Sequence, residues 1–324
     1  MTRRISQHMG WCLALYAGTA AAQAPGAVYP AKPVRVVVPS SPGGGTDILA
    51  RVLAQKLSES QGQQFVVENR PGAGQVIGIE AVARSAPDGY TLLMAASAIV
   101  INEVLYAKPP YDTLRDFAPV TLGASLPNIL VVHPALPVKS VRELIALAKT
   151  HPRQLNYSSA GSGTSPHLSM ELFRLMADIT LTHIPYKGIG PATIDLVAGQ
   201  VQLSMPNVLT ALPQIKGGKL RALGVTGGKR AASLPNIPAI AESVPGYEVI
   251  QWYGVLAPAG TAREIVNKLQ QEMARILVLP DVKERLAADG ADAVGSRPDE
   301  FAAYIRSELA KWSKVVKTGG IKLE

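Results

Sequence analysis

A short strand, a glycine-rich turn and a helix follow one another in residues 34–51, and this unit constrains the fold most strongly. Val34-Arg-Val-Val-Val38 is rich in β-branched residues and predicts a buried strand. The glycines at positions 43–45 interrupt it. Thr46 is a suitable N-cap, and Asp47 then lies in the first helical turn, where the helix dipole favours a carboxylate. A strand, turn and helix N-terminus in this order form a backbone arrangement that suits an anion.

Taken alone, such a turn is more often a structural chain reversal than a ligand site, because isolated glycine motifs are weak signals. A P-loop is a poorer fit because Thr46-Asp47, rather than Lys-Ser or Lys-Thr, follows Gly45. A dinucleotide fingerprint is also a poorer fit because the run of three glycines does not give G-x-G-x-x-G.

A second unit of the same form occurs further along the chain. Leu155-Asn-Tyr-Ser-Ser159 is a predicted strand, residues 160–164 form a turn of small residues, and Ser165 is a predicted N-cap before Pro166. The two units are alike in form but are not a sequence repeat. Two such loops, one from each domain, are expected to enclose a small anion, which favours the ligand-site interpretation of the first turn.

Strands and helices alternate along the chain, which favours a parallel α/β sheet. The chain has 324 residues, of which 47% are hydrophobic, and this size predicts two domains. Ala96-Ser97 is a further small-residue turn at the carboxyl end of a predicted strand. Ser140 with Glu143 and Thr261 with Glu264 are predicted capping boxes. The last helix, from Pro298, carries an apolar stripe at Phe301, Ile305, Leu309 and Trp312.

The N-terminus has the features of a signal peptide, predicted to span residues 1–22. Arg3 and Arg4 precede an apolar stretch, and Ala20-Ala21-Ala22 offers a cleavage site. A membrane anchor is the alternative, but the apolar stretch is shorter than the ~20 residues of a spanning helix. The only cysteine, Cys12, lies in this segment, so the mature chain is expected to have no disulfide or thiolate chemistry. We therefore expect an exported, soluble protein.

The charged and polar residues give few signs of catalysis. The net charge is +8, but no basic block points to nucleic acid. None of the histidines has the spacing of a zinc motif, and His167 with Glu171 is expected to be a helix-face contact, so no metal or cofactor is predicted. Ser162 resembles a nucleophile elbow only weakly, because the G-x-S-x-G frame fails. Lys187 is either an anion contact or a solvated loop lysine.

Motifs across nearly the whole mature chain resemble the Bug-type solute-binding proteins of tripartite tricarboxylate transporters. They are Tyr29-Pro-Ala-Lys-Pro33, Val38-Pro-Ser-Ser-Pro-Gly-Gly44, Val67-Glu-Asn-Arg-Pro-Gly-Ala-Gly74, Pro87-Asp-Gly-Tyr-Thr-Leu-Leu93, Asn156-Tyr-Ser-Ser-Ala-Gly161, Ile184-Pro-Tyr-Lys-Gly188, Lys219-Leu-Arg-Ala-Leu223, Ala257-Pro-Ala-Gly-Thr261 and Val315-Val-Lys317. Each motif is weak alone, but this many in order is highly specific.

The resemblance implies a type II periplasmic binding protein fold, in which two α/β domains close on a ligand at a hinge. Domain 1 is expected at residues 25–125 plus 252–324 and domain 2 at residues 126–251. The loops at residues 40–47 and 159–165 match those that hold a ligand carboxylate in the family. The expected ligand-binding residues are Ser40, Ser41, Gly43, Gly44, Thr46, Asp47, Ala96, Ser97, Ser159, Ala160, Gly161, Ser162, Gly163, Thr164, Ser165, Tyr186 and Asn207.

Two positions depart from the family pattern. Ser40 stands where the family often has an aromatic residue, and Met205-Pro206-Asn207 stands where it often has Phe-Asp-Asn. The missing carboxylate weakens the case for a ligand amino group. The resemblance implies a monomeric, non-enzymatic receptor for a small carboxylate that delivers it to transporter membrane subunits. The alternatives are a ligand-sensing accessory to a sensor kinase and an exported hydrolase that uses Ser162.

Overall fold

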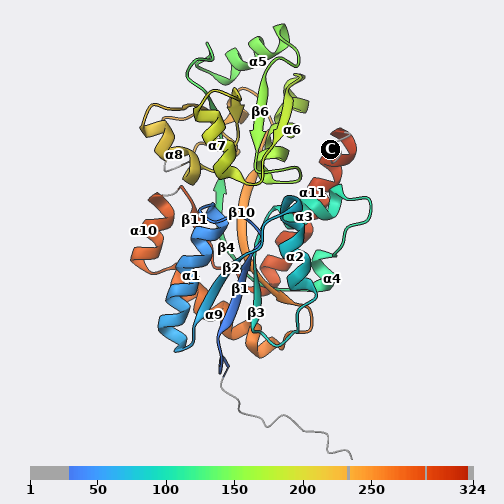
Figure 1. The fold of residues 1–324 in the computed structure, drawn as a ribbon, viewed down its shortest axis with the longest axis vertical. Helices are drawn as coiled ribbons and strands as arrows, with labels where there is room; N and C mark the ends of the chain where they lie inside the picture. Colours follow the sequence, from blue (N-terminus) through green and yellow to red (C-terminus); the bar gives the residue numbers. More distant parts are fainter. Residues whose placement is uncertain (1–28, 232–233, 289, 320–324) are drawn as a thin grey trace, which may run out of the picture.

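The computed structural model describes residues 29–231, 234–288 and 290–319. The predicted signal peptide at residues 1–22, with Cys12, lies outside these ranges. Figure 1 shows two lobes stacked along the long axis of the molecule. We call the six-stranded sheet with its helices the first lobe, and the five-stranded sheet with its helices the second lobe.

The strands are β1 Val34–Val38, β2 Phe65–Asn69, β3 Thr91–Ala96, β4 Phe117–Pro127, β5 Ile129–Val132, β6 Asn156–Ser159, β7 Thr182–Pro185, β8 Leu203–Ser204, β9 Arg221–Val225, β10 Ile250–Pro258 and β11 Asp292–Ala293. The helices are α1 Gly45–Gln61, α2 Val76–Ala83, α3 Ala98–Leu105, α4 Thr113–Asp116, α5 Val141–Thr150, α6 Ser165–Ala177, α7 Ile189–Val197, α8 Val208–Lys216, α9 Arg263–Leu277, α10 Pro280–Ala288 and α11 Pro298–Gly319. Two 3₁₀ turns lie at Ala73–Gln75 and Ile240–Glu242.

Both sheets are mixed, so the prediction of a parallel sheet is wrong in part. The first sheet has the order β11-β4-β10-β3-β1-β2, in which β1 is parallel to β2 and β3, whereas β10 is antiparallel to β3 and β4. The second has the order β7-β6-β8-β5-β9, and β5 is antiparallel to both neighbours. Strand β10 brings the chain back from the second lobe, so it enters the first sheet without the crossover that a parallel neighbour needs.

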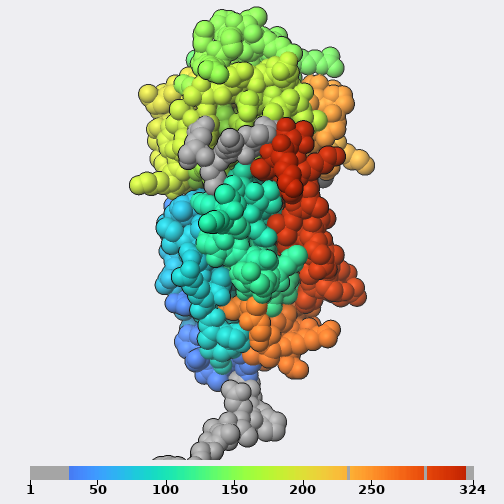
Figure 2. All heavy atoms as spheres, turned by 90° about the vertical axis from the view of Figure 1, so that its right-hand side faces the viewer, coloured from blue at the N-terminus to red at the C-terminus, as the bar shows by residue number. Residues whose placement is uncertain are grey.

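The core forms because strand residues alternate between two helical layers. In β3, Leu92 and Met94 belong to the same core cluster as residues of α1, α9 and α10, while Leu93 and Ala95 belong to the cluster that includes residues of α2, α3 and α11. The predicted stripe of α11 is confirmed as a packing face, because Phe301, Ile305 and Trp312 are buried against the sheet. Figure 2 shows α11, in red, running along the first lobe up to the second, and α11 also contacts α6.

One of the two predicted capping boxes has the expected N-cap. The Ser140 hydroxyl accepts a hydrogen bond from the Glu143 N–H at the start of α5. The box at Thr261 and Glu264 is wrong, because α9 begins at Arg263 after Ala262. The Thr261 hydroxyl instead donates to the Pro258 carbonyl at 2.7 Å.

The chain passes between the lobes at two neighbouring places. Asn128 alone separates β4 from β5, and β10 begins directly after Val249. Thr226 ties the passages together, since its hydroxyl accepts from the Asn128 N–H at 2.7 Å and donates to the Val249 carbonyl at 2.7 Å. The residues at these passages therefore lie between the lobes, where a ligand would bind.

Candidate functional site

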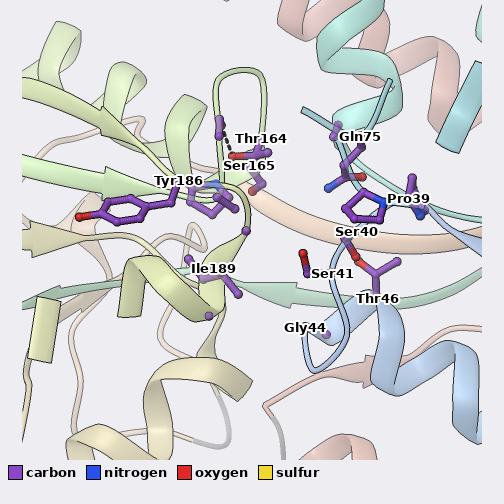
Figure 3. A pocket seen from close by; sticks show the side chains of 18 of the residues that line it. Pro39, Ser40, Ser41, Gly44, Thr46, Gln75, Thr164, Ser165, Tyr186 and Ile189 are labelled. Carbon is purple, nitrogen blue, oxygen red and sulfur yellow. Dashed lines mark hydrogen bonds between the residues drawn. The ribbon is translucent and has the colours of Figure 1, made fainter. Parts of the chain in front are cut away.

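A cavity of about 750 Å³ lies between the lobes. Figure 3 shows Pro39, Ser40 and Thr46 of the first lobe facing Thr164, Ser165 and Ile189 of the second. The wall consists of Pro39, Ser40, Ser41, Pro42, Gly43, Gly44, Gly45, Thr46, Pro71, Gly72, Ala73, Gly74, Gln75, Ala98, Asn128, Ala160, Gly161, Thr164, Ser165, Pro166, Tyr186, Lys187, Gly188, Ile189, Gly190, Pro191, Asn207, Thr210, Gln251 and Tyr253.

Within the part of the chain that the structure describes, six helices begin at this cavity. The N-cap or first residue of α1, α2, α3, α6, α7 and α8 is part of its wall. In the described chain, α8 alone of the six has a side-chain cap, in which Asn207 Oδ1 accepts from the Thr210 N–H at 2.9 Å. The other five have no side chain bonded to their first-turn N–H groups in the part of the chain that the structure covers. Converging positive dipole ends and uncapped N–H groups favour an anion.

The side chains of the wall add little charge. Lys187 is the one charged residue among the wall residues described, and it is exposed; none of them is aspartate or glutamate. Three buried oxygens of the wall, Ser40 Oγ, Gln75 Oε1 and Asn128 Oδ1, have no hydrogen-bond partner within the described ranges. The cavity therefore combines a positive backbone field with polar side chains that a ligand can engage.

The first loop, residues 39–46, is held from behind by Asp47. The Asp47 carboxylate accepts hydrogen bonds from the Gly43 N–H at 3.0 Å, Asn69 Nδ2 at 2.9 Å and Arg51 Nε at 3.0 Å. Burial acts to raise the pKa of Asp47, but these hydrogen bonds outweigh it and lower the pKa below its usual value. Asp47 does not line the cavity. The predicted cap at Thr46 is wrong, because α1 begins at Gly45 with Gly44 as N-cap.

Tyr253 and Asn207 join the lobes beside the first loop. Asn207 Nδ2, of the second lobe, donates to Tyr253 Oη at 3.1 Å. Burial raises the pKa of Tyr253 well above its usual value, so its hydroxyl stays protonated. Both side chains lie close to Gly45, since a Cβ there would lie 2.4 Å from Tyr253 Oη and 3.2 Å from Asn207 Nδ2. A side chain at position 45 would therefore disturb the contact between the lobes.

The second loop, residues 160–166, has two glycines in the left-handed region. Gly161 has φ +120° and Gly163 has φ +78°. The Thr164 hydroxyl donates to the Gly161 carbonyl at 2.6 Å and closes the loop. Helix α6 begins at Ser165 with Thr164 as N-cap, one residue earlier than predicted. Asn128 Nδ2 donates to Ser165 Oγ at 2.8 Å and connects this loop to the first passage between the lobes.

The structure brings most of the predicted residues to the cavity wall. Those on the wall are Ser40, Ser41, Gly43, Gly44, Thr46, Ala160, Gly161, Thr164, Ser165, Tyr186 and Asn207. Those off the wall are Asp47, Ala96, Ser97, Ser159, Ser162 and Gly163. The Ser97 hydroxyl donates to Gln251 Oε1 at 2.6 Å. Tyr186 points its ring away from the cavity (Figure 3), and its hydroxyl donates to Asp195 at 2.6 Å.

Five polar residues of the described wall were missed: Thr210, Gln75, Asn128, Gln251 and Tyr253. The last three lie in or next to the passages between the lobes, so the predicted domain boundaries at residues 125–126 and 251–252 were a usable signal. Nothing in the sequence predicted that Gln75 lies on the wall. Gln75 has φ +87°, and Ala73 and Gly74 before it also lie in the left-handed region, which a non-glycine residue rarely adopts.

Ser162 lacks the surroundings of a nucleophile. It does not line the cavity, and the nearby His167 uses Nδ1 to accept the Gly163 N–H at 3.2 Å. In the ranges that the structure covers, no cluster of three metal-ligating side chains is present. No helix in those ranges is long and apolar enough to cross a membrane.

Comparison with known proteins gives the family. Residues 49–321 match the model of the tripartite tricarboxylate transporter family receptor. Protein BugT of Bordetella pertussis is 40% identical over 299 residues, which cover 91% of this chain and 92% of BugT. The solved structure of R. palustris Rpa4515 with adipate is 40% identical with a TM-score of 0.88 and covers 91% of this chain and 99% of its own.

A second solved structure, MatC from Rhodopseudomonas palustris with bound malate, is 32% identical with a TM-score of 0.85 and covers 89% of this chain and 100% of its own. Both structures are named with a small carboxylate, and both share the two-lobed α/β architecture. The chain belongs to the tripartite tricarboxylate transporter family of receptors and is a Bug-type member of it.

Proposed function

We propose that this chain is a periplasmic receptor that binds a small carboxylate between its lobes and delivers it to the membrane subunits of a tripartite transporter. One observation supports this most. In the described chain, five helices without a side-chain cap have their N-termini at one cavity, and no residue of the described wall is acidic. Helix N-termini of this kind bind carboxylates without a dedicated arginine.

The predicted site residues on the wall then divide into two halves of one carboxylate site. The first loop and the second loop each present a helix N-terminus, and Tyr253, Gln251 and Asn128 add polar groups between them. The domains are proposed at residues 25–125 plus 252–324 and residues 126–251, moving about the two passages as a hinge. Delivery is expected from a monomer whose closed form the membrane subunits recognise.

The absence of an acidic side chain among the described wall residues predicts discrimination against amino acids. An α-ammonium group would lose its hydration in the cleft and gain no carboxylate partner. We expect 2-aminoadipate to bind about a hundredfold more weakly than adipate, and aspartate more weakly than succinate to a similar extent. Calorimetry on the purified mature chain measures both pairs. Equal or tighter binding of the amino diacids would contradict a site that offers no carboxylate partner to an ammonium group.

The role of the second loop predicts different effects at two neighbouring hydroxyls. Thr164→Ala removes the 2.6 Å bond to the Gly161 carbonyl on the cavity wall, so we expect about a tenfold loss of affinity for adipate. Ser162→Ala is the matched control, because Ser162 lies off the wall, and we expect a change within about twofold. Calorimetry compares the two, and unchanged binding by Thr164→Ala would remove the second loop from the site.

The proposed delivery role is tested by uptake in cells. Deleting the gene should abolish uptake of the bound radiolabelled carboxylate, and deleting adjacent transporter membrane genes should have the same effect. Normal uptake with loss of a transcriptional response to the same carboxylate would instead indicate a sensor accessory.

A further inference from the structure

The imidazoles of His167, which is buried, and His183, which is half-buried, lie behind the second loop, outside the cavity wall. The rings of His167 in α6 and His183 in β7 are stacked with centroids 4.2 Å apart, and the ring of Tyr157 in β6 stacks on His183 at 4.8 Å. The stacking of the rings covers their faces, but it does not require their nitrogen atoms to face the loop.

Both imidazoles are connected to glycine amides of the loop. The Gly163 N–H donates to His167 Nδ1 at 3.2 Å. The Gly161 N–H donates to Ser159 Oγ at 3.1 Å, and Ser159 Oγ is bonded to His183 Nε2 at 2.7 Å. Gly161 and Gly163 are the two left-handed glycines that set the loop's shape. The histidines therefore hold the loop at the residues whose conformation is most sensitive.

The bond from Gly163 fixes the protonation state of His167. Nδ1 can accept only while it carries no proton, so His167 must be the neutral tautomer with its proton on Nε2. A protonated imidazole would turn a donor toward the Gly163 N–H, and one buried bond would become a repulsive contact.

We propose that His167 is a positioning residue for ligand binding, which holds the second loop in its binding form only while its imidazole is neutral. The ligand would then be released in acid by a change in the loop rather than only by neutralisation of the ligand. This inference rests on the proposed function for its meaning, but the state of the loop can be measured without any ligand.

The surroundings of His167 favour the neutral form. Burial lowers the pKa of His167 to about 4, with a smaller opposing effect from Glu171 and a smaller supporting effect from Arg174. Burial, followed by the charge of His167, lowers the pKa of His183 to about 3. Glu171 is itself held by Arg174 Nη2 at 2.7 Å and by the Tyr157 hydroxyl at 2.8 Å. The titratable groups around His167 are thus His183, Tyr157, Glu171 and Arg174.

The sign of the pH dependence follows from these values. An unfolded histidine titrates near pH 6.5, so between about pH 6.5 and 4 the unfolded chain binds more protons than the folded chain. Stability contributed by the neutral histidines is complete above pH 6.5 and falls as the pH drops through this window. We expect the melting temperature to fall over the same range, and less so in His167→Asn, whose residue 167 does not titrate.

Two variants separate the role of residue 167 as a hydrogen-bond acceptor from its titration. In His167→Asn the side-chain oxygen takes the place of Nδ1 as an acceptor and carries no titratable proton, whereas His167→Ala removes the acceptor. At pH 7 we expect adipate to bind to wild type and His167→Asn within about twofold, and about tenfold more weakly to His167→Ala. Below pH 4 the affinity of wild type relative to His167→Asn should fall about tenfold per pH unit, and adipate protonation cancels in this ratio.

A ligand-independent measurement accompanies the calorimetry. In ¹H–¹⁵N spectra, the Gly163 amide of wild type should titrate with a midpoint near pH 4, and that of His167→Asn should not. A Gly163 amide that titrates alike in both proteins, or an affinity ratio that is flat with pH, would overturn the inference. If no variant binds adipate or any other carboxylate while the Gly163 amide titrates as expected, the proposed function fails and the loop switch stands.

Discussion

Replacing Gly45 with alanine should reduce the affinity for carboxylates by about a hundredfold or more. The added Cβ would lie 2.4 Å from Tyr253 Oη and 3.2 Å from Asn207 Nδ2. Tyr253 is nearly fully buried and bonded to Asn207, so neither side chain can move away without breaking the contact between the lobes. We also expect the melting temperature to fall by several degrees, because Tyr253 belongs to the core of the first lobe.

The neighbouring glycine provides the control. Gly44 has φ −81°, and a Cβ there would lie in ordinary contact with the Ser41 carbonyl oxygen at 3.9 Å. Gly44→Ala should therefore fold normally and retain most of the affinity. Calorimetry and melting curves of both variants decide the point. If Gly45→Ala binds as well as Gly44→Ala, the lobes do not meet at α1 when ligand is bound.

Gly163→Ala should have an effect of similar size at the opposite side of the cleft. Its φ of +78° is strained for alanine, and the added Cβ would lie 2.0 Å from Asn102 Oδ1, which belongs to the first lobe. Asn102 is buried, and its Nδ2 donates to the Gly74 carbonyl at 2.7 Å. Gly74 in turn approaches the second loop, since a Cβ there would lie 2.5 Å from the Ser162 carbonyl oxygen. The methyl group would therefore hold the lobes apart.

A double-mutant cycle separates the collision from the backbone strain. In the wild-type background we expect Gly163→Ala to reduce the affinity about a hundredfold. In an Asn102→Ala background the collision is absent. Gly163→Ala should then reduce the affinity only about fivefold, because the strain of alanine in the left-handed conformation is the one effect left. Calorimetry with adipate on the four proteins gives the coupling. Additive losses would mean that Asn102 and Gly163 are not in contact in the bound form.

Local units were predictable from the sequence because they depend on neighbouring residues. The strand and glycine-rich turn before α1 and the turn before α6 are set by β-branched residues and glycines within a few positions. The apolar stripe of α11 follows from simple periodicity, and it packs as expected. The helix starts were displaced, because Gly44 rather than Thr46 is the N-cap of α1, two residues earlier than predicted, and Thr164 rather than Ser165 is the N-cap of α6, one residue earlier.

Features that depend on distant contacts were not predictable in the same way. The antiparallel entry of β10 is set by the route of the chain through the second lobe, which no local pattern records. Asp47 and Ser159 lie in the predicted loops, but their side chains hold the loops and do not line the cavity. Asp47 is bonded to Asn69 and Arg51, and Ser159 to His183, and these distant partners could not be predicted locally. Tyr253 reaches the cavity because Asn207 meets it across the lobes.

The most direct measurement of carboxylate binding is a calorimetric titration of the mature chain with adipate, other linear diacids and malate, each compared with its diamide. The diamide keeps the length and shape of the ligand but removes the negative charge that the helix N-termini favour. We predict that at least one diacid binds with a dissociation constant of about micromolar or below. Its diamide should bind at least about a hundredfold more weakly. Failure of every carboxylate to bind, or equal binding of acid and diamide, would contradict carboxylate recognition in this cleft.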